Sequence, residues 1–587
     1  MSGAMSRESS LRRMLFRAAP TLLFGALLLA ALVTRQSDGK GVEFYVSPSG
    51  RPNASGTIHD PWDLKTALSH PKAVAPGDTI WLLQGVYHGV FESTLRGEPG
   101  RPIMVRQFPG GRVTIDTGLA ASGAGLAVLG SDCWFWGIEI ESSNPIRTSS
   151  ENGPEPHDLH RVPAVTVLGA RTKFINMVIH DTAGGYGFWT PAEDSEIYGN
   201  LIFHNGWSAP DRGHGHGIYA QNRNGKKRIE DNIAFSNFGM GIRAYGSENA
   251  FANNIEFIGN VSFNAGVLYG SPPERWANFF VTVGRGAQDI LLDSNYSYHR
   301  PADNRGGSSL GWVFSGIEKN IIVRNNYWIG GSSAIELWNW DDITFEGNVA
   351  YSDAELVLLL NHLPEQDRSR YHWDRNKYYG SDLMRLNGRN SRWSQWRQST
   401  GLDAHSTYHA GRPKGTWVFL RPNKYESGRA NLIIYNWDLL DQVPVDLTQI
   451  LSEGTFYEIR DAQNFFGKPL LTGVYHGQRI LVPMKGLGAA APVSLPPPEH
   501  TAPEFAVFVI TGNSGSTAPD MHPGATDLAR RAIAVSSWLI NRNKSMLSLY
   551  CHASNKMVHC VFMHSSADNR MLQEASGARG FARAQPL

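Results

Sequence analysis

The densest group of side chains that could do chemistry is one glycine-rich stretch near the middle of the chain, Asp211-Arg212-Gly213-His214-Gly215-His216-Gly217-Ile218-Tyr219. Its two imidazoles are two positions apart, so they share a face wherever the backbone is extended. An acid, a guanidinium and a phenol lie within a few residues. This combination is typical of a site that transfers protons or contacts a polar substrate.

Three interpretations of this stretch are open. The histidines can bind the carbonyl groups of a tight turn, as structural residues. Asp211, His214 and His216 can ligate a metal ion, although no fourth ligand is evident. Alternatively they act as acid, base or substrate contacts. Strand alternation opposes the metal and the catalytic interpretations. Alternate residues share a face, so His216 points inward like Ile218 unless the chain bends at Gly217.

A recurring asparagine predicts the elements that must position these residues. A unit with an apolar residue, two variable residues, asparagine and a further apolar residue recurs at intervals of 22 to 35 residues, at Asn176, Asn200, Asn232, Asn260, Asn295, Asn326 and Asn348. Asparagine tolerates the left-handed backbone of a sharp corner, and stacked copies can hydrogen-bond along an axis. The repeat therefore predicts a solenoid of short strands, in which loop insertions explain the uneven spacing.

A second set of short apolar stretches falls between these corners. Alternation predicts that one residue of each points inward, namely Phe188, Ile218, Ile242, Phe279 and Ile335. The neighbouring side chains then stack on the outer face, namely Trp189, Tyr219, Arg243, Phe280 and Glu336. Because parallel strands lie about 4.8 Å apart, Arg243 and Tyr245 should lie beside Tyr219 and Gln221.

The start of the chain has a further signal. Tyr45 to Gly50, a short amphipathic helix over Pro61–Leu68, a turn at Pro76-Gly77-Asp78 and a strand after it follow one another. This order resembles the start of pectate-lyase-like proteins, which are right-handed parallel β-helices. The resemblance covers roughly residues 42–410 and implies a capping helix over the open end of the solenoid. It also implies a carbohydrate-active superfamily, in which lyases, hydrolases, epimerases and adhesins share one fold.

Long loops locate the predicted groove. The insertions Ser143–Val162, Asn205–Gly215, Ala265–Trp276 and Arg300–Gly311 all precede strands of one sheet, and an open groove between such loops suits a long polymer. β-Elimination on a uronate requires a base, a proton donor for the leaving oxygen and positive charge on the carboxylate. His214 or His216 is the predicted base, Tyr219 the donor, and Arg212 or Arg243 the carboxylate partner.

Other groove residues are predicted to bind substrate. Trp189, Phe280, Trp338 and Trp340 suit stacking on sugar rings, or simply cover the sheet, and Gln221 and Tyr245 complete the predicted substrate contacts. No cofactor is certain. Some β-helix lyases use Ca²⁺ on the substrate carboxylate, and Asp181 with Asp211 would be its ligands here.

Inverting hydrolysis is the rival reaction. It needs two carboxyl groups about 6.5–9.5 Å apart, and the acids near the cluster are Asp181, Glu193, Asp194 and Glu248. Gly215-His216-Gly217 and Gly241-Ile242-Arg243 also resemble elements of polygalacturonases. The order of Ile242 and Arg243 is reversed and the acidic motifs are missing from 185–193, so that mechanism is not transferred. A non-catalytic glycan-binding or structural protein is the third alternative.

Composition limits the partners and the compartment. Lys and Arg total 54 against 53 Asp and Glu, so no basic surface for nucleic acid is expected. Three cysteines cannot form a disulfide framework. Arginines 12, 13 and 17 precede an apolar run from Pro20 to Val33, which predicts a cleaved export signal or an uncleaved membrane anchor. The oligomeric state is not predicted.

The expected organisation is an all-β chain in five parts. Residues 1–40 are the signal or anchor, 41–120 the N-terminal cap and first coils, and 121–415 the right-handed parallel β-helix with its groove. Residues 416–512 form a small C-terminal antiparallel β-sandwich on the end of the solenoid, and 513–587 a tail of low order. The predicted protein is exported and acts on a polysaccharide, with β-elimination as the favoured reaction.

Overall fold

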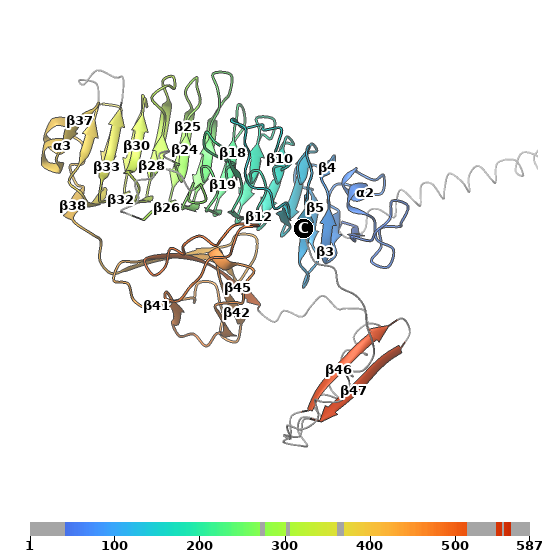
Figure 1. The fold of residues 1–587 in the computed structure, drawn as a ribbon. Helices are drawn as coiled ribbons and strands as arrows, with labels where there is room; N and C mark the ends of the chain where they lie inside the picture. The colour runs from blue at the N-terminus through green and yellow to red at the C-terminus, as the bar shows by residue number, and fades with distance from the viewer. Residues whose placement is uncertain are drawn as a thin grey trace, which may run out of the picture. The chain divides into compact units, whose positions relative to one another are not determined.

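The computed structural model describes residues 41–269, 276–300, 306–360, 369–513, 547–554 and 557–564. Three sheets of 12 strands each run side by side, and the chain visits them in turn (Figure 1). All their pairings are parallel except the pair β36–β37. The predicted parallel β-helix is therefore confirmed.

The three sheets have these bounds. The first sheet contains β1 (Glu43–Val46), β2 (Thr79–Leu82), β5 (Ile103–Gln107), β8 (Cys133–Trp136), β11 (Lys173–Ile175), β14 (Glu196–Tyr198), β19 (Lys227–Glu230), β22 (Asn253–Ile258), β25 (Gln288–Asp293), β28 (Lys319–Arg324), β31 (Ile343–Glu346) and β34 (Tyr371–Asp374). The second contains β3 (Gly85–His88), β6 (Val113–Asp116), β9 (Glu139–Glu141), β12 (Val178–His180), β15 (Leu201–Phe203), β20 (Ile233–Phe235), β23 (Val261–Phe263), β26 (Tyr296–Tyr298), β29 (Tyr327–Ile329), β32 (Val349–Ser352), β35 (Lys377–Gly380) and β38 (Thr407–Ala410). The third contains β4 (Phe91–Ser93), β7 (Leu126–Val128), β10 (Val165–Val167), β13 (Tyr186–Phe188), β18 (Ile218–Ala220), β21 (Ile242–Ala244), β24 (Phe279–Val281), β27 (Ser309–Leu310), β30 (Ser333–Trp338), β33 (Glu355–Leu360), β36 (Met384–Leu386) and β37 (Arg389–Ser391).

The inside of the solenoid is an apolar column. The five residues predicted to point inward are all fully buried. One detail of register differs, because Phe188 lies beside Ala220 and Gly187 lies beside Tyr219. Trp189 is therefore beyond the end of β13 instead of directly beside Tyr219.

An asparagine ladder forms the corner between the first and second sheets. Each side-chain amide donates to the carboxamide oxygen of the asparagine in the next coil, from Asn200 through Asn232, Asn260, Asn295, Asn326 and Asn348 to Asn376. Two predictions need correction. Asn176 is outside the ladder, since Asn200 accepts from the main chain of Met177. The left-handed residue of each corner is the one before the ladder asparagine, such as Gly199 or Asp231.

Both ends of the solenoid are covered. The helix α2 (Leu64–Leu68) begins at Asp63, whose carboxylate accepts the N–H of Thr66, and it buries Leu64, Ala67 and Leu68 against the first coils. The predicted capping helix is thus confirmed. At the other end, α3 (Trp393–Thr400) places Trp396 in the core beside Trp373.

The C-terminal sandwich has a five-stranded antiparallel sheet in the order β39 (Thr416–Pro422), β40 (Arg429–Asn436), β45 (Phe505–Asn513), β42 (Phe456–Asp461) and β43 (Leu471–Val474). One face packs on the ribbon of β41 (Gln442–Val445) and β44 (Ile480–Pro483). The 3₁₀ turn η1 (Ala462–Asn464) follows β42. The other face packs on the outer side of the second sheet, through contacts such as Tyr298 stacked on Phe505. The sandwich therefore lies along the flank of the solenoid and not on its end, which corrects the prediction.

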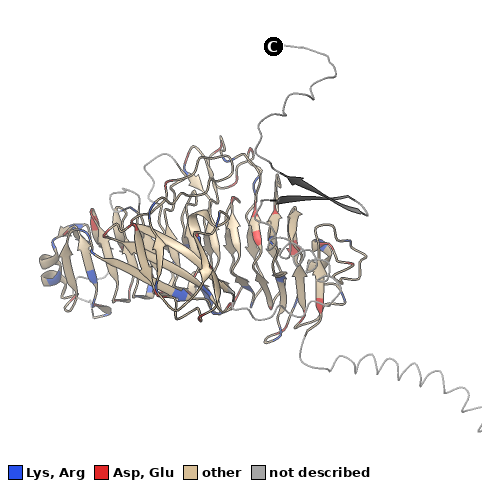
Figure 2. Ribbon diagram, turned by 90° about the horizontal axis from the view of Figure 1, so that it is seen from below, with Lys and Arg blue, Asp and Glu red and all other residues tan. Residues whose placement is uncertain are grey.

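Beyond the sandwich, the described residues contain one more pair of strands. The strands β46 (Leu547–Ser554) and β47 (Met557–His564) pair antiparallel within the tail for which low order is expected. Residues 1–40, with the predicted signal or anchor, lie outside the described residues. No described helix has the length and hydrophobicity of a membrane-spanning segment. Figure 2 shows that most strand positions are uncharged, as expected for a stacked solenoid.

Candidate functional site

A groove of about 1180 Å³ runs along the outer face of the third sheet. Its floor is the row of outward side chains on consecutive strands, which the register places side by side as Gly187, Tyr219, Arg243, Phe280, Ser309 and Glu336. Its wall contains residues from all four predicted insertions, within 154–162, 207–215, at Trp276 and within 306–309. The predicted location of the groove agrees with the structure, because each of these insertions enters a strand of this one sheet.

Arg243 occupies the centre of the floor. Its guanidinium carbon lies 4.4 Å from the ring centroid of Tyr219 and 4.2 Å from that of Tyr245. Burial lowers its pKa from the usual 12.5, and Nε is buried with no hydrogen-bond partner. Within the described part of the chain its neighbours are Tyr219, Tyr245, Met240 and Arg212, and no carboxylate is among them. The half-buried side chain is thus a partly desolvated cation whose charge is available to an anionic ligand.

His216 lines the groove, which answers the objection from strand alternation. Gly215 has φ of +89° and ends the short pair β16 (Trp207–Ser208) and β17 (Gly213–His214), so the chain bends before β18 begins. The Nδ1 atom accepts the main-chain N–H of Met240 at 3.1 Å. In the neutral ring Nε2 therefore carries the proton. Burial, followed by the charge of Arg243, lowers the pKa of His216 well below 6.5, so it is a neutral donor.

His214, in the wall of the groove, pairs with Asp211, which is exposed and is not among the described lining residues. His214 Nε2 is 3.0 Å from Asp211 Oδ1, and its ring stacks on Trp207 with centroids 5.1 Å apart. His214 is buried, whereas Asp211 also accepts the N–H of Gly153. This arrangement anchors the insertion to the groove, so His214 fits a wall residue better than a mobile base.

The charge of the groove is uneven. Besides Arg243, its lining includes Arg212 and the buried Arg161, whose pKa burial and Arg147 lower to about 9. The carboxylates among the described lining residues are Glu155 and Glu336, and Glu336 lies four strands from Tyr219. The half of the groove around β13, β18 and β21 is therefore cationic.

Aromatic rings line much of the floor. Trp189 meets Tyr219 edge to face at 5.2 Å, and Tyr245 lies 5.7 Å from Phe280. Phe280 is only 8% exposed, so it offers a ligand little surface. Two predicted contacts differ. Gln221 donates to the carbonyl oxygen of Tyr245 and is not part of the described lining. Trp340 is buried and donates to Leu310, whereas Trp338 does line the groove.

Sequence reasoning missed several wall residues, namely Arg161, Trp207, Met240, Trp276 and Trp312. All five come from insertions or loops without a repeat, where periodicity gives no orientation. Trp207 had one usable signal, because a hairpin that turns at Pro210-Asp211 would place it opposite His214.

The predicted calcium ligand Asp181 lies in a different environment from Asp211. Its carboxylate is buried and pairs with Arg147 and with His180 Nδ1, and it accepts the N–H of Val493. With its oxygens occupied, Asp181 is not available to bind Ca²⁺ together with Asp211.

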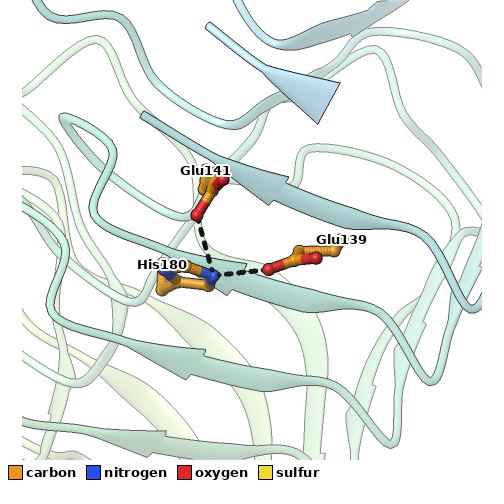
Figure 3. Close-up of side chains that lie close together, drawn as sticks. All are labelled: Glu139, Glu141 and His180. Carbon is orange, nitrogen blue, oxygen red and sulfur yellow. Dashed lines mark hydrogen bonds and ion pairs between the residues drawn. The ribbon is translucent and has the colours of Figure 1, made fainter. Parts of the chain in front are cut away.

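Another cluster has donor types for a metal ion. Glu139, Glu141 and His180, from β9 and β12, place one ligand atom each within 4.8 Å of one another (Figure 3). His180 Nε2 lies 2.9 Å from Glu139 Oε1 and 3.6 Å from Glu141 Oε2. Burial lowers the pKa of His180, but hydrogen bonds to Asp181 and Glu139 raise it to about 9. The protonated imidazole and Arg112 already supply the positive charge that these carboxylates need.

Comparisons with known proteins concern the fold. Protein-family models and curated proteins give no match. Solved structures similar to the chain include the pectate lyase Pel9A, with 16% identity over 64% of this chain and 79% of that one at a TM-score of 0.36. A rhamnogalacturonan lyase gives 16% identity, 56% and 86% coverage and a TM-score of 0.37. The A-module of the Azotobacter vinelandii mannuronan C-5 epimerase AlgE6 is 14% identical over 60% of this chain and 86% of that one, with a TM-score of 0.38. Such likenesses support no inference about the reaction.

Proposed function

We propose that the protein acts on an anionic polysaccharide in the groove over the third sheet, as a lyase that cleaves a uronate-containing glycan by β-elimination. The observation that carries this proposal is the half-buried Arg243 between Tyr219 and Tyr245, in an open groove that has further cations and aromatic rings. Anionic groups bind such cations, and sugar rings stack on exposed aromatic faces.

In the proposed mechanism, Arg243 and Arg212 bind the uronate carboxylate and His216 donates its Nε2 proton in a hydrogen bond to a carboxylate oxygen. These contacts stabilise the negative charge that develops as the C5 proton leaves. Tyr219 exchanges one proton for another, because its phenolic oxygen takes the C5 proton as its own hydroxyl proton passes to the leaving C4 oxygen. The C5–H electrons form the C4–C5 double bond and the C4–O bond breaks, so Tyr219 ends the step as it began.

This assignment changes the predicted roles. His216 was a candidate base, but its Nδ1 already accepts the N–H of Met240, so no lone pair of the neutral ring faces the groove. His214 is the alternative base. Tyr219 is preferred because it is at the centre of the floor and directly under Arg243.

Hydrolysis with inversion is less well supported. The acids proposed for a catalytic pair were Asp181, Glu193, Asp194 and Glu248, and none of them is in the described lining of the groove. The carboxylates that do line it, Glu155 and Glu336, come from an entry loop and from β30.

Export belongs to the same proposal. The basic segment followed by an apolar run in residues 1–40 fits a signal or an anchor, and export would bring the protein to a polysaccharide outside the cytoplasm. We propose a periplasmic, extracellular or cell-surface location, with no nucleic-acid partner. Fractionation of cells that express the full chain tests the location.

A screen of uronate polymers tests the reaction. The unsaturated product of elimination absorbs in the ultraviolet through its conjugated double bond, whereas a hydrolase releases reducing ends without that absorbance. We expect absorbance with at least one polymer. Fragments without absorbance would support hydrolysis, and affinity without fragments would support a binding protein.

Two variants link the product to the site. Tyr219→Phe removes the proton carrier and should lower turnover about 100-fold or more while substrate affinity is retained. Arg243→Met should reduce both affinity and turnover. Phe456→Ala, at an exposed position of the sandwich, is the control and should leave activity unchanged.

A further inference from the structure

A second hollow of about 330 Å³ adjoins the groove and is not explained by the catalytic residues. Tyr245 and Trp312 line both spaces, so the hollow continues the groove beyond Arg243. Its other residues come from the loops after β21, β24 and β27, and they include Ser247, Glu248, Asn249, Thr282, Phe314 and Ser315.

The hollow has a fixed floor. The N–H of Gly284 donates to the carbonyl of Gly246, and the N–H of Gly316 donates to that of Gly284, both at 2.9 Å. A Cβ atom at Gly284 would lie 2.6 Å from the main-chain nitrogen of Glu248. Glycine at this position therefore lets the loops stack closely, and the three loops form one surface.

One aromatic side chain is presented to solvent beside this floor. Phe314 is 76% exposed, and Trp312 meets it edge to face at 5.0 Å. The turn that holds them is anchored, since Asn339 donates to the carbonyls of Trp312 and Ser315, and Ser315 donates to Trp312. An exposed ring on an anchored turn offers a flat apolar surface at little entropic cost to a ligand.

The charge of this hollow is opposite to that of the groove. Its described lining has no Lys, Arg or His, and its one ionisable acid is Glu248, which is exposed. The cationic groups, Arg161, Arg212 and Arg243, all belong to the groove. A ligand that extends through both spaces therefore meets positive charge first, then a carboxylate and aromatic rings.

We propose that this hollow is a subsite for a non-acidic sugar unit that follows the acidic unit bound at Arg243. The unit stacks on Phe314, and its hydroxyl, amide or amino groups donate to Glu248. An acidic sugar is disfavoured there by repulsion from Glu248. The inference rests on the proposed function and makes its substrate a mixed polymer in which acidic and non-acidic sugars are neighbours.

The test compares two sets of oligosaccharides of equal length with the full chain. One set contains only uronate units and the other alternates uronate with a neutral or amino sugar. The affinity for each set is measured by calorimetry, both in the wild type and in Tyr219→Phe, in which turnover of the ligand is slow. We expect the mixed set to bind at least tenfold more tightly. Equal affinity for the two sets, or tighter binding of the uronate set, overturns the inference.

Two variants locate the effect. Phe314→Ala should weaken binding of the mixed set about five- to tenfold, the scale of one lost ring contact, and should leave the uronate set unchanged. Glu248→Gln should reduce the preference between the sets. Phe456→Ala is the control for loss of an exposed ring elsewhere.

The outcomes separate this inference from the proposed function. Unsaturated products from either set, with no effect of Phe314→Ala on affinity, would leave the lyase standing and remove the subsite. Binding of the mixed set that depends on Phe314, without unsaturated product from any polymer, would keep the subsite and remove the lyase.

Discussion

The Nδ1 atom of His216 accepts the N–H of Met240, and this contact decides what the imidazole can offer the groove. With Nδ1 occupied by a donor, the neutral ring presents an N–H and no lone pair. The sequence alone left the ring free to be base, ligand or turn residue. Only the partner of its second nitrogen distinguishes these roles, and that partner lies on the next coil.

Substitution of His216 tests this role. Glutamine can accept the N–H of Met240 and donate an amide N–H, so His216→Gln should retain activity within about tenfold, whereas His216→Ala should lose about 100-fold. Turnover on the polymer found in the screen measures both. A greater loss in His216→Gln than in His216→Ala would contradict the donor role.

The pH dependence gives an independent check. Burial lowers the pKa of His216 well below 6.5, so the ring is neutral on both sides of its usual titration range. We expect no loss of turnover from this residue as the pH falls through about 6.5. NMR of the ring carbons in the wild type should show no titration there, and a midpoint near 6.5 would contradict the assignment.

The ion-pair cluster around His180 predicts a pH-dependent stability. Its folded pKa of about 9 exceeds the usual 6.5, so the stabilisation is complete below 6.5 and is lost as the pH rises through 9. Glu139 behaves oppositely. Burial raises its pKa, but His180 and Arg112 lower it to about 2, so its contribution is lost as the pH falls from about 4.5 to 2.

Urea unfolding measures this cluster. Between about pH 6 and pH 9.5 the wild type should lose roughly 3 kcal/mol of unfolding free energy through His180 alone. His180→Gln should be less stable at pH 6 and nearly insensitive over the same interval. A similar loss in both proteins would show that other groups cause the dependence.

The corner between the first and second sheets explains why the asparagine repeat was visible in the sequence. Each buried ladder asparagine has a fixed set of partners, which asparagine satisfies as both donor and acceptor, and the pattern survives insertions elsewhere. A second ladder, in which Asn205 donates to Asn237, was missed because it is short. The left-handed positions vary between Gly, Asp, Ser, Asn and Arg, so composition does not reveal them.

Only part of the groove could be predicted from the sequence. The outward row Tyr219, Arg243 and Phe280 follows from strand alternation, and the structure confirms their adjacency. The partners of Asp181, His214 and Gln221 do not follow from it. These residues lie at or beyond strand ends, where loops from other coils compete for each polar atom and no period constrains the direction of a side chain.

Removal of one ladder residue should weaken the whole solenoid. Asn260→Ala deletes a side chain that donates to Asn295 and Ile229 and accepts from the main chain of Asn232. Buried partners left without hydrogen bonds cost about 1–3 kcal/mol each, so we expect a loss of roughly 3 kcal/mol. Asn224→Ala, at an exposed position, should change stability by less than about 0.5 kcal/mol in the same urea titration.

The sandwich and the solenoid share a hydrophobic core. Outward residues of the second sheet, including Phe235, Phe263 and Tyr298, pack against Tyr435 and Phe505. Ion pairs surround this core, such as Arg421 with Asp231 and Lys424 with Glu230. The sandwich thereby covers the outer face of the second sheet and completes a core there, whereas the groove lies on the third sheet.

This shared core predicts that the two parts unfold together. Tyr298 is buried, stacks on Phe505 at 4.5 Å and donates to Glu504, so Tyr298→Ala should cost about 3–5 kcal/mol and lower the melting temperature of sandwich and solenoid alike. Calorimetry should give one transition in the wild type and one, at lower temperature, in the variant. Phe456→Ala, on the exposed side of the same sandwich, should leave the transition in place. If the variant instead shows two transitions, with that of the solenoid unchanged, then the sandwich and the solenoid are only weakly docked. Two parts that share one cooperative core would both be destabilised by the loss of a buried ring between them.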